Sequence, residues 1–132
     1  MSRHVVHCPL RWSDADTNGH INNVSLLRYL EEARVRLQHD LARALANASS
    51  VFVVARQEIE YKRPLLYRPE PVTIETWVTK IGGASVGLAY EIKDDEVYAR
   101  SSATVVSFDP ASNRPARIGE VEKTFLGRYL AP

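Results

Sequence analysis

One long helical pattern, followed by a lasting change to strand periodicity, constrains the fold of this chain more than any other feature. Apolar residues recur at three- and four-residue spacings from Val24 to about Leu45, as in an amphipathic helix. They are Leu26, Leu27, Leu30, Ala33, Leu37, Leu41 and Leu45. A helix of this length would span roughly 30 Å at 1.5 Å per residue, about the width of a small domain.

Alternating apolar and polar residues replace the helical pattern after a short polar connection at residues 46–50. Strands are predicted over residues 51–63, 72–81, 84–93 and 96–108, with Pro, Gly and Asp residues at their turns. Composition predicts a loop at residues 109–115. A short helix is predicted over residues 119–129, docking Val121, Phe125 and Leu126.

A further strand is predicted ahead of the long helix, over residues 4–12. Its apolar face would carry Val6, Cys8, Leu10 and Trp12. Pro9 cannot donate a ladder hydrogen bond, so this strand should lie at a sheet edge. One helix against strands joined by short turns predicts an α+β fold, in which an antiparallel sheet curls round the helix.

Length and charge restrict the class of protein. The 132 residues are expected to form one domain, residues 1–132, with a second copy covering an exposed sheet edge in a homodimer at least. Seventeen Lys and Arg residues against sixteen Asp and Glu leave a formal charge of +1, which disfavours nucleic acid as a partner. No long apolar run or leader-like segment occurs, and Cys8 is the single cysteine, so a cytoplasmic protein without membrane contact is expected.

The segment DADTNGHINN, residues 14–23, is the candidate site, because it places many polar side chains just before a helix start. Calcium is one alternative, since Asp14, Asp16, Asn18 and Gly19 match the first positions of an EF-hand loop. Ser25 stands where that loop needs its bidentate carboxylate, which disfavours the alternative. A second alternative is that these side chains only form turns and cap the helix.

Acyl transfer is the third interpretation of the segment. The free N–H groups of a helix start can polarise a thioester carbonyl, while a nearby carboxylate attacks it or activates a water molecule. A single Asx residue suffices for a cap, whereas four precede this helix together with Gly19, which lets the backbone approach a ligand closely.

The run LRWSDADTNGHINNVSLLRYLEEAR, residues 10–34, resembles the signature of hotdog-fold acyl-CoA thioesterases of the 4-hydroxybenzoyl-CoA thioesterase type. That signature reads roughly D-x-D-x-x-G-H-V-N-N, followed by Y-x-x-Y-x-E-x-A-R. Weaker similarity continues through Tyr61 and Pro64, the strand with Ser85, the run VVSFD, and Arg114 with Pro115. The resemblance implies a hotdog fold, in which a five-stranded antiparallel sheet wraps one long helix and dimerises edge to edge.

The resemblance also implies roles for individual residues. Asp16 matches the catalytic carboxylate, with its role as nucleophile or general base left open, and the backbone N–H that binds the thioester oxygen falls at or near Asn23. The expected substrate-binding residues are Gly19, His20, Asn22, Leu26, Arg63 and Ser85. Leu26 departs from the family pattern, which has Tyr there, so the acyl group cannot be inferred from relatives. His20 is expected to act as a hydrogen-bond partner within the loop.

The expected activity is hydrolysis of an acyl-CoA thioester to a free acid and CoA, without metal or organic cofactor. Candidates for binding the CoA phosphates are Arg63, Lys80 and Arg100. Two alternatives stay open from sequence: an acyl carrier protein thioester as substrate, and a hotdog protein that binds an acyl ligand without hydrolysing it. The sequence also leaves open whether the assembly is a homodimer or a homotetramer.

Overall fold

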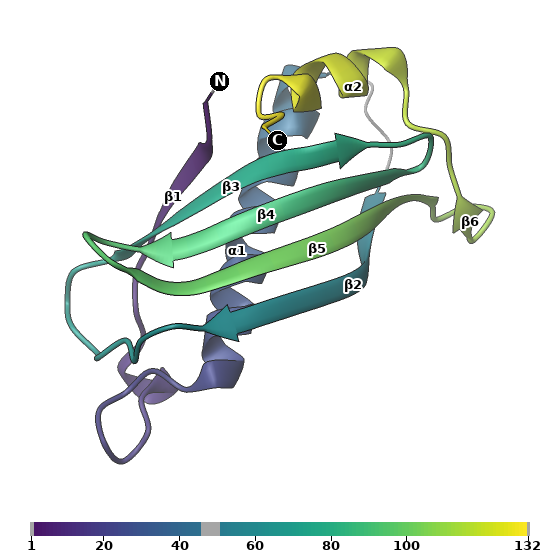
Figure 1. Ribbon diagram of the computed structural model, residues 1–132. Coiled ribbons are helices and arrows are strands. Elements are labelled where there is room, and N and C mark those ends of the chain that lie inside the picture. Colours follow the sequence, from purple (N-terminus) through teal and green to yellow (C-terminus); the bar gives the residue numbers. More distant parts are fainter. Residues whose placement is uncertain (1, 46–50, 132) are drawn as a thin grey trace.

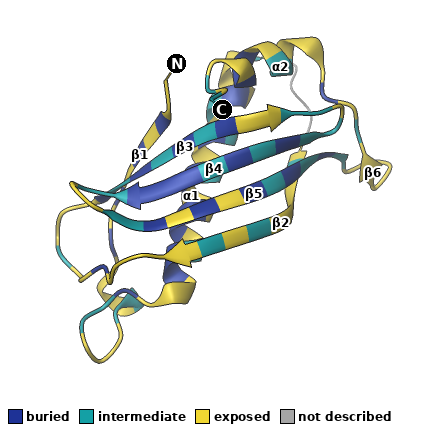
Figure 2. Cartoon of the chain, viewed as in Figure 1, coloured by how far each residue is buried: buried dark blue, intermediate teal, exposed yellow. Residues whose placement is uncertain are grey.

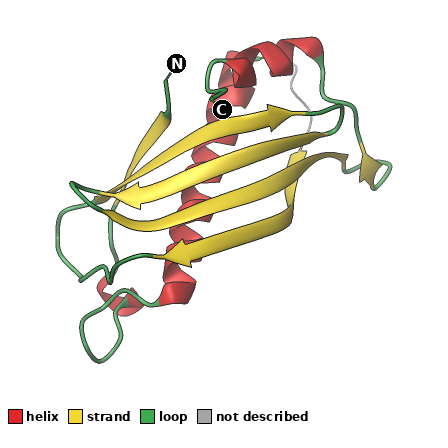
Figure 3. Ribbon diagram, in the orientation of Figure 1, coloured by secondary structure: helices red, strands yellow, loops and turns green. Residues whose placement is uncertain are grey.

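A six-stranded antiparallel sheet lies against one side of a long helix in the computed structural model of the chain, which describes residues 2–45 and 51–131 (Figure 1). The strands are β1 (His4–Cys8), β2 (Val51–Tyr61), β3 (Val72–Ile81), β4 (Ser85–Lys93), β5 (Val97–Asp109) and β6 (Arg114–Pro115). The helices are a 3₁₀ turn (Trp12–Asp14), α1 (Asn23–Ala44) and α2 (Glu120–Gly127). The sheet order is β1-β3-β4-β5-β2, with the two-residue β6 paired to β5. Figure 3 shows α1 behind the sheet, and the predicted α+β hotdog architecture is confirmed.

Helix α1 forms where the apolar spacing predicted it. Asn22 caps it, since its side-chain oxygen accepts a hydrogen bond from the Val24 N–H. Its buried face consists of Ser25, Leu26, Tyr29, Leu30, Ala33, Leu37 and Leu41. Leu27 and Leu45 are partly buried against the same core. The predicted connection at residues 46–50 lies outside the described residues.

Strand β3 buries alternate residues from Val72 to Val78, and β4 does so up to Tyr90, beyond which Glu91 and Ile92 are both buried (Figure 2). Residues that face α1 from these strands are Val72, Ile74, Thr76 and Val78 of β3, and Val86, Leu88, Tyr90 and Ile92 of β4. Thr76 pairs with Tyr90, and Tyr90 pairs with Ser101 of β5, so polar side chains form one row across this mostly apolar face. Cys8 of β1 is buried, and burial raises the pKa of its thiol, as expected for a small core residue.

Three sequence predictions of local structure were wrong. Strand β1 ends at Cys8, before Pro9, and Trp12 lies in the 3₁₀ turn with its side chain 76% exposed. The predicted loop at residues 109–115 contains β6, which pairs back onto the end of β5. Val121 of α2 is 64% exposed, and only Phe125 and Leu126 dock into the core, because α2 starts at Glu120 and turns Val121 outward.

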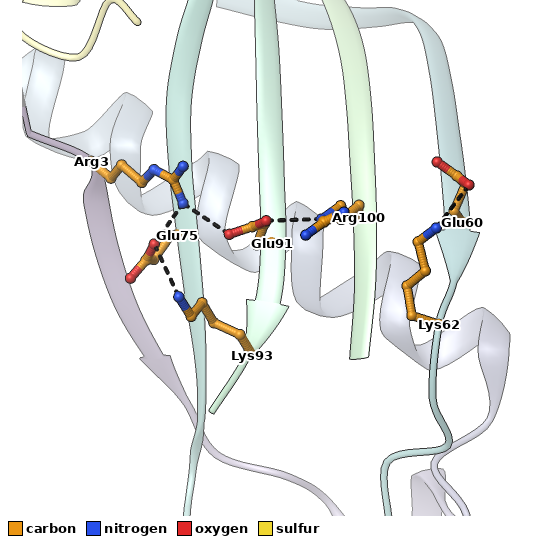
Figure 4. Close-up of polar contacts among 7 residues, drawn as sticks. All are labelled: Arg3, Glu60, Lys62, Glu75, Glu91, Lys93 and Arg100. Atoms are coloured by element: carbon orange, nitrogen blue, oxygen red, sulfur yellow. Dashed lines mark hydrogen bonds and ion pairs between the residues drawn. The ribbon is translucent and has the colours of Figure 1, made fainter. Parts of the chain in front are cut away.

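Charged side chains form a ladder on the sheet face away from α1 (Figure 4). Arg3 binds Glu75 at 2.9 Å and Glu91 at 2.8 Å, and Glu91 also accepts a hydrogen bond from Arg100 at 3.0 Å. The Arg3 guanidinium lies 3.8 Å from the ring centroid of Trp77. The ladder therefore links Arg3, the residue just before β1, to β3, β4 and β5 across the outer face of the sheet.

Replacing Glu91 with glutamine is expected to make the free energy of unfolding depend less on pH under acid conditions. Burial raises the pKa of this carboxyl, but hydrogen bonds from Arg100 and Arg3 outweigh burial and hold it below its usual 4.5. A carboxyl whose pKa is lower in the folded state stabilises the fold above its unfolded pKa, and this stability is lost as pH falls below about 4.5. The variant should lose about 1 kcal/mol at neutral pH, and this loss should shrink at acid pH as pH falls through the lowered pKa of Glu91.

Urea unfolding at several pH values measures this effect. Glu70→Gln is the matched control, because Glu70 is an exposed carboxylate for which no ion pair with a described residue is found. An equal loss of stability at neutral and acid pH in Glu91→Gln would contradict the prediction.

Candidate functional site

The segment between the 3₁₀ turn and α1 closes on itself as a tight loop. The Asp16 N–H donates to the His20 carbonyl at 2.8 Å, and the Gly19 N–H donates to the Asp16 carbonyl at 3.0 Å. Gly19 has φ +78, in the left-handed region that L side chains rarely adopt. The glycine expected from the sequence is therefore required by the backbone of this loop.

Asp16 uses one carboxylate oxygen to hold the loop. Its Oδ1 accepts hydrogen bonds from the Asn18 N–H at 2.9 Å and the His20 N–H at 3.1 Å. Its Oδ2 accepts none from the described residues, and the side chain is exposed. One oxygen is thus fixed by the backbone, while the other remains available to a ligand or to water.

The first turn of α1 presents a free backbone donor close in sequence to this carboxylate. Val24 donates to the Asn22 side chain at 2.9 Å, and the N–H groups of Ser25 and Leu26 donate to the Asn22 carbonyl. The Asn23 N–H finds no acceptor within residues 2–45 and 51–131. The helix dipole also favours negative charge at this position. The Asn23 N–H is therefore suited to donate a hydrogen bond to an oxygen that becomes negatively charged during a reaction.

The segment that connects β2 to β3 holds the loop from the other side. The Ile21 N–H donates to the Leu65 carbonyl at 2.7 Å, and the Tyr67 N–H donates to the Gly19 carbonyl at 2.9 Å. Tyr61, the last residue of β2, donates its hydroxyl to the Asn23 carbonyl at 3.1 Å. The loop and the start of α1 are therefore both fixed to residues at or just beyond the end of β2.

Asp14 supports the loop through the helix. Its Oδ2 accepts a hydrogen bond of 2.8 Å from the hydroxyl of Tyr29, which is buried in α1. Burial raises the pKa of Tyr29 well above its ordinary value, and the hydrogen bond to Asp14 raises it further. The phenol thus stays protonated and donates, so Asp14 positions the loop and is not the free carboxylate.

Six of the eight residues singled out by sequence line one hollow of about 260 Å³. They are Asp16, His20, Asn22, Asn23, Leu26 and Arg63. Gly19 belongs to the loop that forms its wall. The His20 imidazole makes no hydrogen bond with a described residue, whereas its backbone N–H binds Asp16. Ile21, Pro64 and Leu65 complete the lining.

Ser85 does not join this hollow within one chain. It begins β4 after the β3–β4 hairpin, at the opposite end of the molecule from the loop of residues 16–20 (Figure 1). It lines a separate hollow together with Lys80 and Arg56. Among the phosphate candidates, Arg63 lies at the first hollow and pairs with Glu96 at 3.1 Å, while Arg100 is part of the ladder.

The sequence assigned no role in the site to residues at the end of β2, in the β2–β3 connection or on the buried face of α1. Leu65 shapes the site only through the folded sheet, so no local spacing indicates its role. Tyr61 belongs to the weaker sequence similarity, but the sequence assigned it no role, and its bond to Asn23 is seen only in the fold. Tyr29 could have been found, because it lies on the apolar face of the predicted helix and its hydroxyl needs a buried partner.

The aspartates of the EF-hand-like run are hydrogen-bonded within the fold. No group of three or more His, Cys, Asp or Glu side chains there is arranged to hold a metal ion. The two aspartates of the EF-hand-like run bind Tyr29 and the loop backbone instead. None of the described helices is long and apolar enough to cross a membrane.

Comparison with known proteins identifies the family. The sequence profile of the thioesterase-like superfamily matches residues 10–125 of the chain. The chain belongs to the thioesterase-like superfamily. The matched region contains the loop, α1 and all strands from β2 to β6.

Two solved structures show how widely this thioesterase-like fold is shared. A predicted thioesterase from Bacillus stearothermophilus superposes with a TM-score of 0.87 at 24% identity, covering 98% of each chain, and this likeness shows the fold alone. A thioesterase from Thermus thermophilus, solved in complex with coenzyme A and Zn, has 28% identity and a TM-score of 0.79. The match covers 95% of this chain and 92% of that one.

One curated relative matches over a shorter region. The Bacillus subtilis (strain 168) protein YsmA, described as uncharacterized, is 32% identical over 82 residues. The match takes in 61% of this chain and 54% of that protein, so the aligned segment spans about half the length of this relative.

Proposed function

We propose that this thioesterase-like protein hydrolyses acyl-CoA thioesters to a free acid and CoA. The observation that carries the proposal is the pairing, in one hollow, of the Asp16 carboxylate with the unused Asn23 N–H at the start of α1. Membership of the superfamily and the coenzyme A held by the Thermus relative support it. The cytoplasmic location expected from the sequence is part of the same proposal.

In the proposed mechanism the thioester oxygen accepts a hydrogen bond from the Asn23 N–H. This donor and the helix dipole stabilise the negative charge that develops on the oxygen as the carbonyl carbon is attacked. The free Oδ2 of Asp16 attacks that carbon or removes a proton from an attacking water molecule. In both routes the carbon–sulfur bond breaks and CoA leaves as a thiolate that takes up a proton. In the first route a water molecule then hydrolyses the mixed anhydride formed with Asp16, which releases the free acid. The loop hydrogen bonds to Oδ1 keep the carboxylate oriented during the reaction.

A thiol-release assay over acyl-CoAs of different length and aromaticity tests the proposal. Turnover of at least one acyl-CoA, with release of the free acid, is the expected result. Binding of the thioesters without release would instead support an acyl-binding protein, and turnover of acyl carrier protein thioesters alone would change the substrate class. Turnover of 4-hydroxybenzoyl-CoA would support the finer subgroup that the sequence motif resembles.

We also propose that a second copy of the chain pairs with the free edge of β2. Strand β2 contacts β5 along one edge only, and no described strand pairs with its other edge. Four large apolar residues along it are exposed: Val51, Val53, Val54 and Tyr61. A long, exposed, apolar edge strand favours association, and an isologous dimer would cover both copies of it.

Placing a charge on this edge is expected to weaken the dimer. Val53→Lys should raise the dimer dissociation constant about tenfold or more, a change of about 1.4 kcal/mol, because a charged lysine on an edge strand opposes edge-to-edge pairing. Light scattering across a dilution series measures the effect. Val121→Lys on the exposed side of α2 is the control and should leave the mass unchanged. A wild type that is monomeric at every concentration would contradict the proposal.

A further inference from the structure

The segment that connects β2 to β3, residues 62–71, belongs to no helix or strand, yet it forms one wall of the hollow that contains Asp16. The residues of this segment that line the hollow are Arg63, Pro64 and Leu65. Residues 65–67 lie antiparallel to residues 19–21 and are joined to them by two backbone hydrogen bonds. The position of the loop therefore depends on what holds this connection in place.

Arg68 fixes this connection to the turn between β4 and β5. Its Nε donates to the Glu70 carbonyl at 3.2 Å, and its Nη2 donates to the Pro71 carbonyl at 3.1 Å. Its Nη1 forms an ion pair with the Asp94 carboxylate and donates to the Tyr98 hydroxyl at 3.4 Å. One guanidinium thus joins two carbonyls of its own segment to two side chains of the β4–β5 hairpin.

Asp94 and Tyr98 hold the connection from the hairpin side. The Tyr98 hydroxyl donates to Asp94 Oδ2 at 2.8 Å. The Tyr98 carbonyl accepts hydrogen bonds from the N–H groups of Lys62 and Arg63, at 2.8 and 3.1 Å. The hydrogen bond from the Arg68 guanidinium holds the pKa of Asp94 below its ordinary value, so this carboxyl is ionised and paired at neutral pH.

A short series of hydrogen bonds leads from Arg68 to Asp16. The residue before Arg68, Tyr67, donates its N–H to the Gly19 carbonyl at 2.9 Å. The Gly19 N–H donates to the Asp16 carbonyl, and the His20 N–H donates to Asp16 Oδ1 at 3.1 Å. A shift of the connection would therefore move the backbone that orients the Asp16 carboxylate. Displacing a reacting group by about 1 Å can lower a rate by about 10².

We infer that Arg68 and Asp94 are positioning residues that keep the Asp16 carboxylate aligned with the thioester carbonyl. This inference rests on the proposed thioester hydrolysis and adds the residues that hold its geometry. Neither Arg68 nor Asp94 lines the hollow, so both act through the connection of residues 62–71. Their side chains are 27% and 30% exposed, which shields the ion pair from water more than at an open surface.

Thiol-release kinetics of Arg68→Met test the inference. The variant should lower kcat by roughly tenfold or more, because the connection loses its attachment to the β4–β5 turn. Asp94→Asn should lower kcat to a similar extent, and the double variant little further, since both substitutions break the same ion pair. Arg68→Lys should recover part of the rate, because lysine keeps the charge but cannot reach both carbonyls and the carboxylate at once.

Arg3→Met is the matched control. Arg3 also forms ion pairs with two carboxylates, but these are Glu75 and Glu91 on the outer face of the sheet. Its loss should therefore change kcat by less than about twofold, although it removes a comparable set of contacts. An equal fall of kcat in Arg3→Met and Arg68→Met would overturn the inference.

The Asp16→Asn background separates positioning from general stabilisation of the fold. If Arg68 acts by orienting Asp16, adding Arg68→Met to Asp16→Asn should lower kcat by less than about twofold further. If Arg68 only stabilises the fold, the same loss should appear in both backgrounds, and the inference is overturned. Circular dichroism melting should show that each variant is folded at the assay temperature, and Asp94→Asn and Arg68→Lys keep the test valid if Arg68→Met does not fold.

Amide hydrogen exchange separates this inference from the proposed function. The Ile21 and Tyr67 amides should exchange roughly tenfold faster in Arg68→Met than in the wild type, and at the wild-type rate in Arg3→Met. If the wild type hydrolyses no acyl-CoA, the proposed function fails, and these rates decide the inference: faster exchange supports it and unchanged exchange overturns it. If the wild type hydrolyses acyl-CoAs and Arg68→Met keeps the wild-type kcat, the inference fails and the proposed function stands.

Discussion

Asp16→Asn is expected to lower kcat for thioester hydrolysis by about 10² to 10⁴, the range for loss of a general base. Asparagine retains an oxygen at the position of Oδ1, which can still accept the hydrogen bonds from Asn18 and His20. The loop should therefore keep its shape, while the second oxygen becomes an amide that neither attacks a carbonyl nor accepts a proton. The KM should change much less than kcat, because the thioester oxygen still binds at Asn23.

Thiol release under saturating substrate measures this change, and the melting temperature of the variant checks that the fold is intact. Glu120→Gln is the control, because Glu120 is an exposed carboxylate in the first turn of α2, and no residue of α2 lines the hollow. If kcat falls by less than about tenfold in Asp16→Asn, Asp16 takes no direct part in the reaction and only holds the loop.

Leu30→Ala is expected to lower the free energy of unfolding by about 2–5 kcal/mol, the largest stability effect predicted for this chain. Leu30 is 1% exposed and belongs to the core between α1 and the sheet. Its truncation removes buried apolar surface and leaves a cavity that the strands cannot close without moving.

Urea denaturation of wild type and variant measures the loss. Val35→Ala is the control on the same helix, since Val35 is 37% exposed and its truncation should cost less than about 1 kcal/mol. Equal losses in the two variants would mean that α1 does not pack on the sheet as described.

Local patterns predicted most of the fold because its elements are individually well marked. The apolar spacing of α1 and the alternation along β3 and β4 reflect which side chains face one core, so sequence alone located these elements. The polar cap and the left-handed Gly19 were also local features. The failures at Trp12, Val121 and β6 concern chain ends and a hairpin, where one or two residues decide which side chain is covered.

Local sequence patterns predicted only part of the candidate site. Residues 16–23 are contiguous, so their grouping is visible in sequence. By contrast, Leu65 and Tyr61 reach the loop through tertiary contacts, and Ser85 lies elsewhere because the β3–β4 hairpin carries it to the far end of the sheet.

The hydrogen bonds between the loop and the β2–β3 connection have a consequence for how the protein is made. Ile21 binds Leu65 and Gly19 binds Tyr67, so the loop is completed by residues more than forty positions later in the chain. These contacts can form only after the ribosome has released the chain as far as Tyr67. Bringing two segments this far apart in the chain together then costs conformational entropy. The nascent chain therefore carries Asp16 for some time without the complete loop geometry that orients its carboxylate.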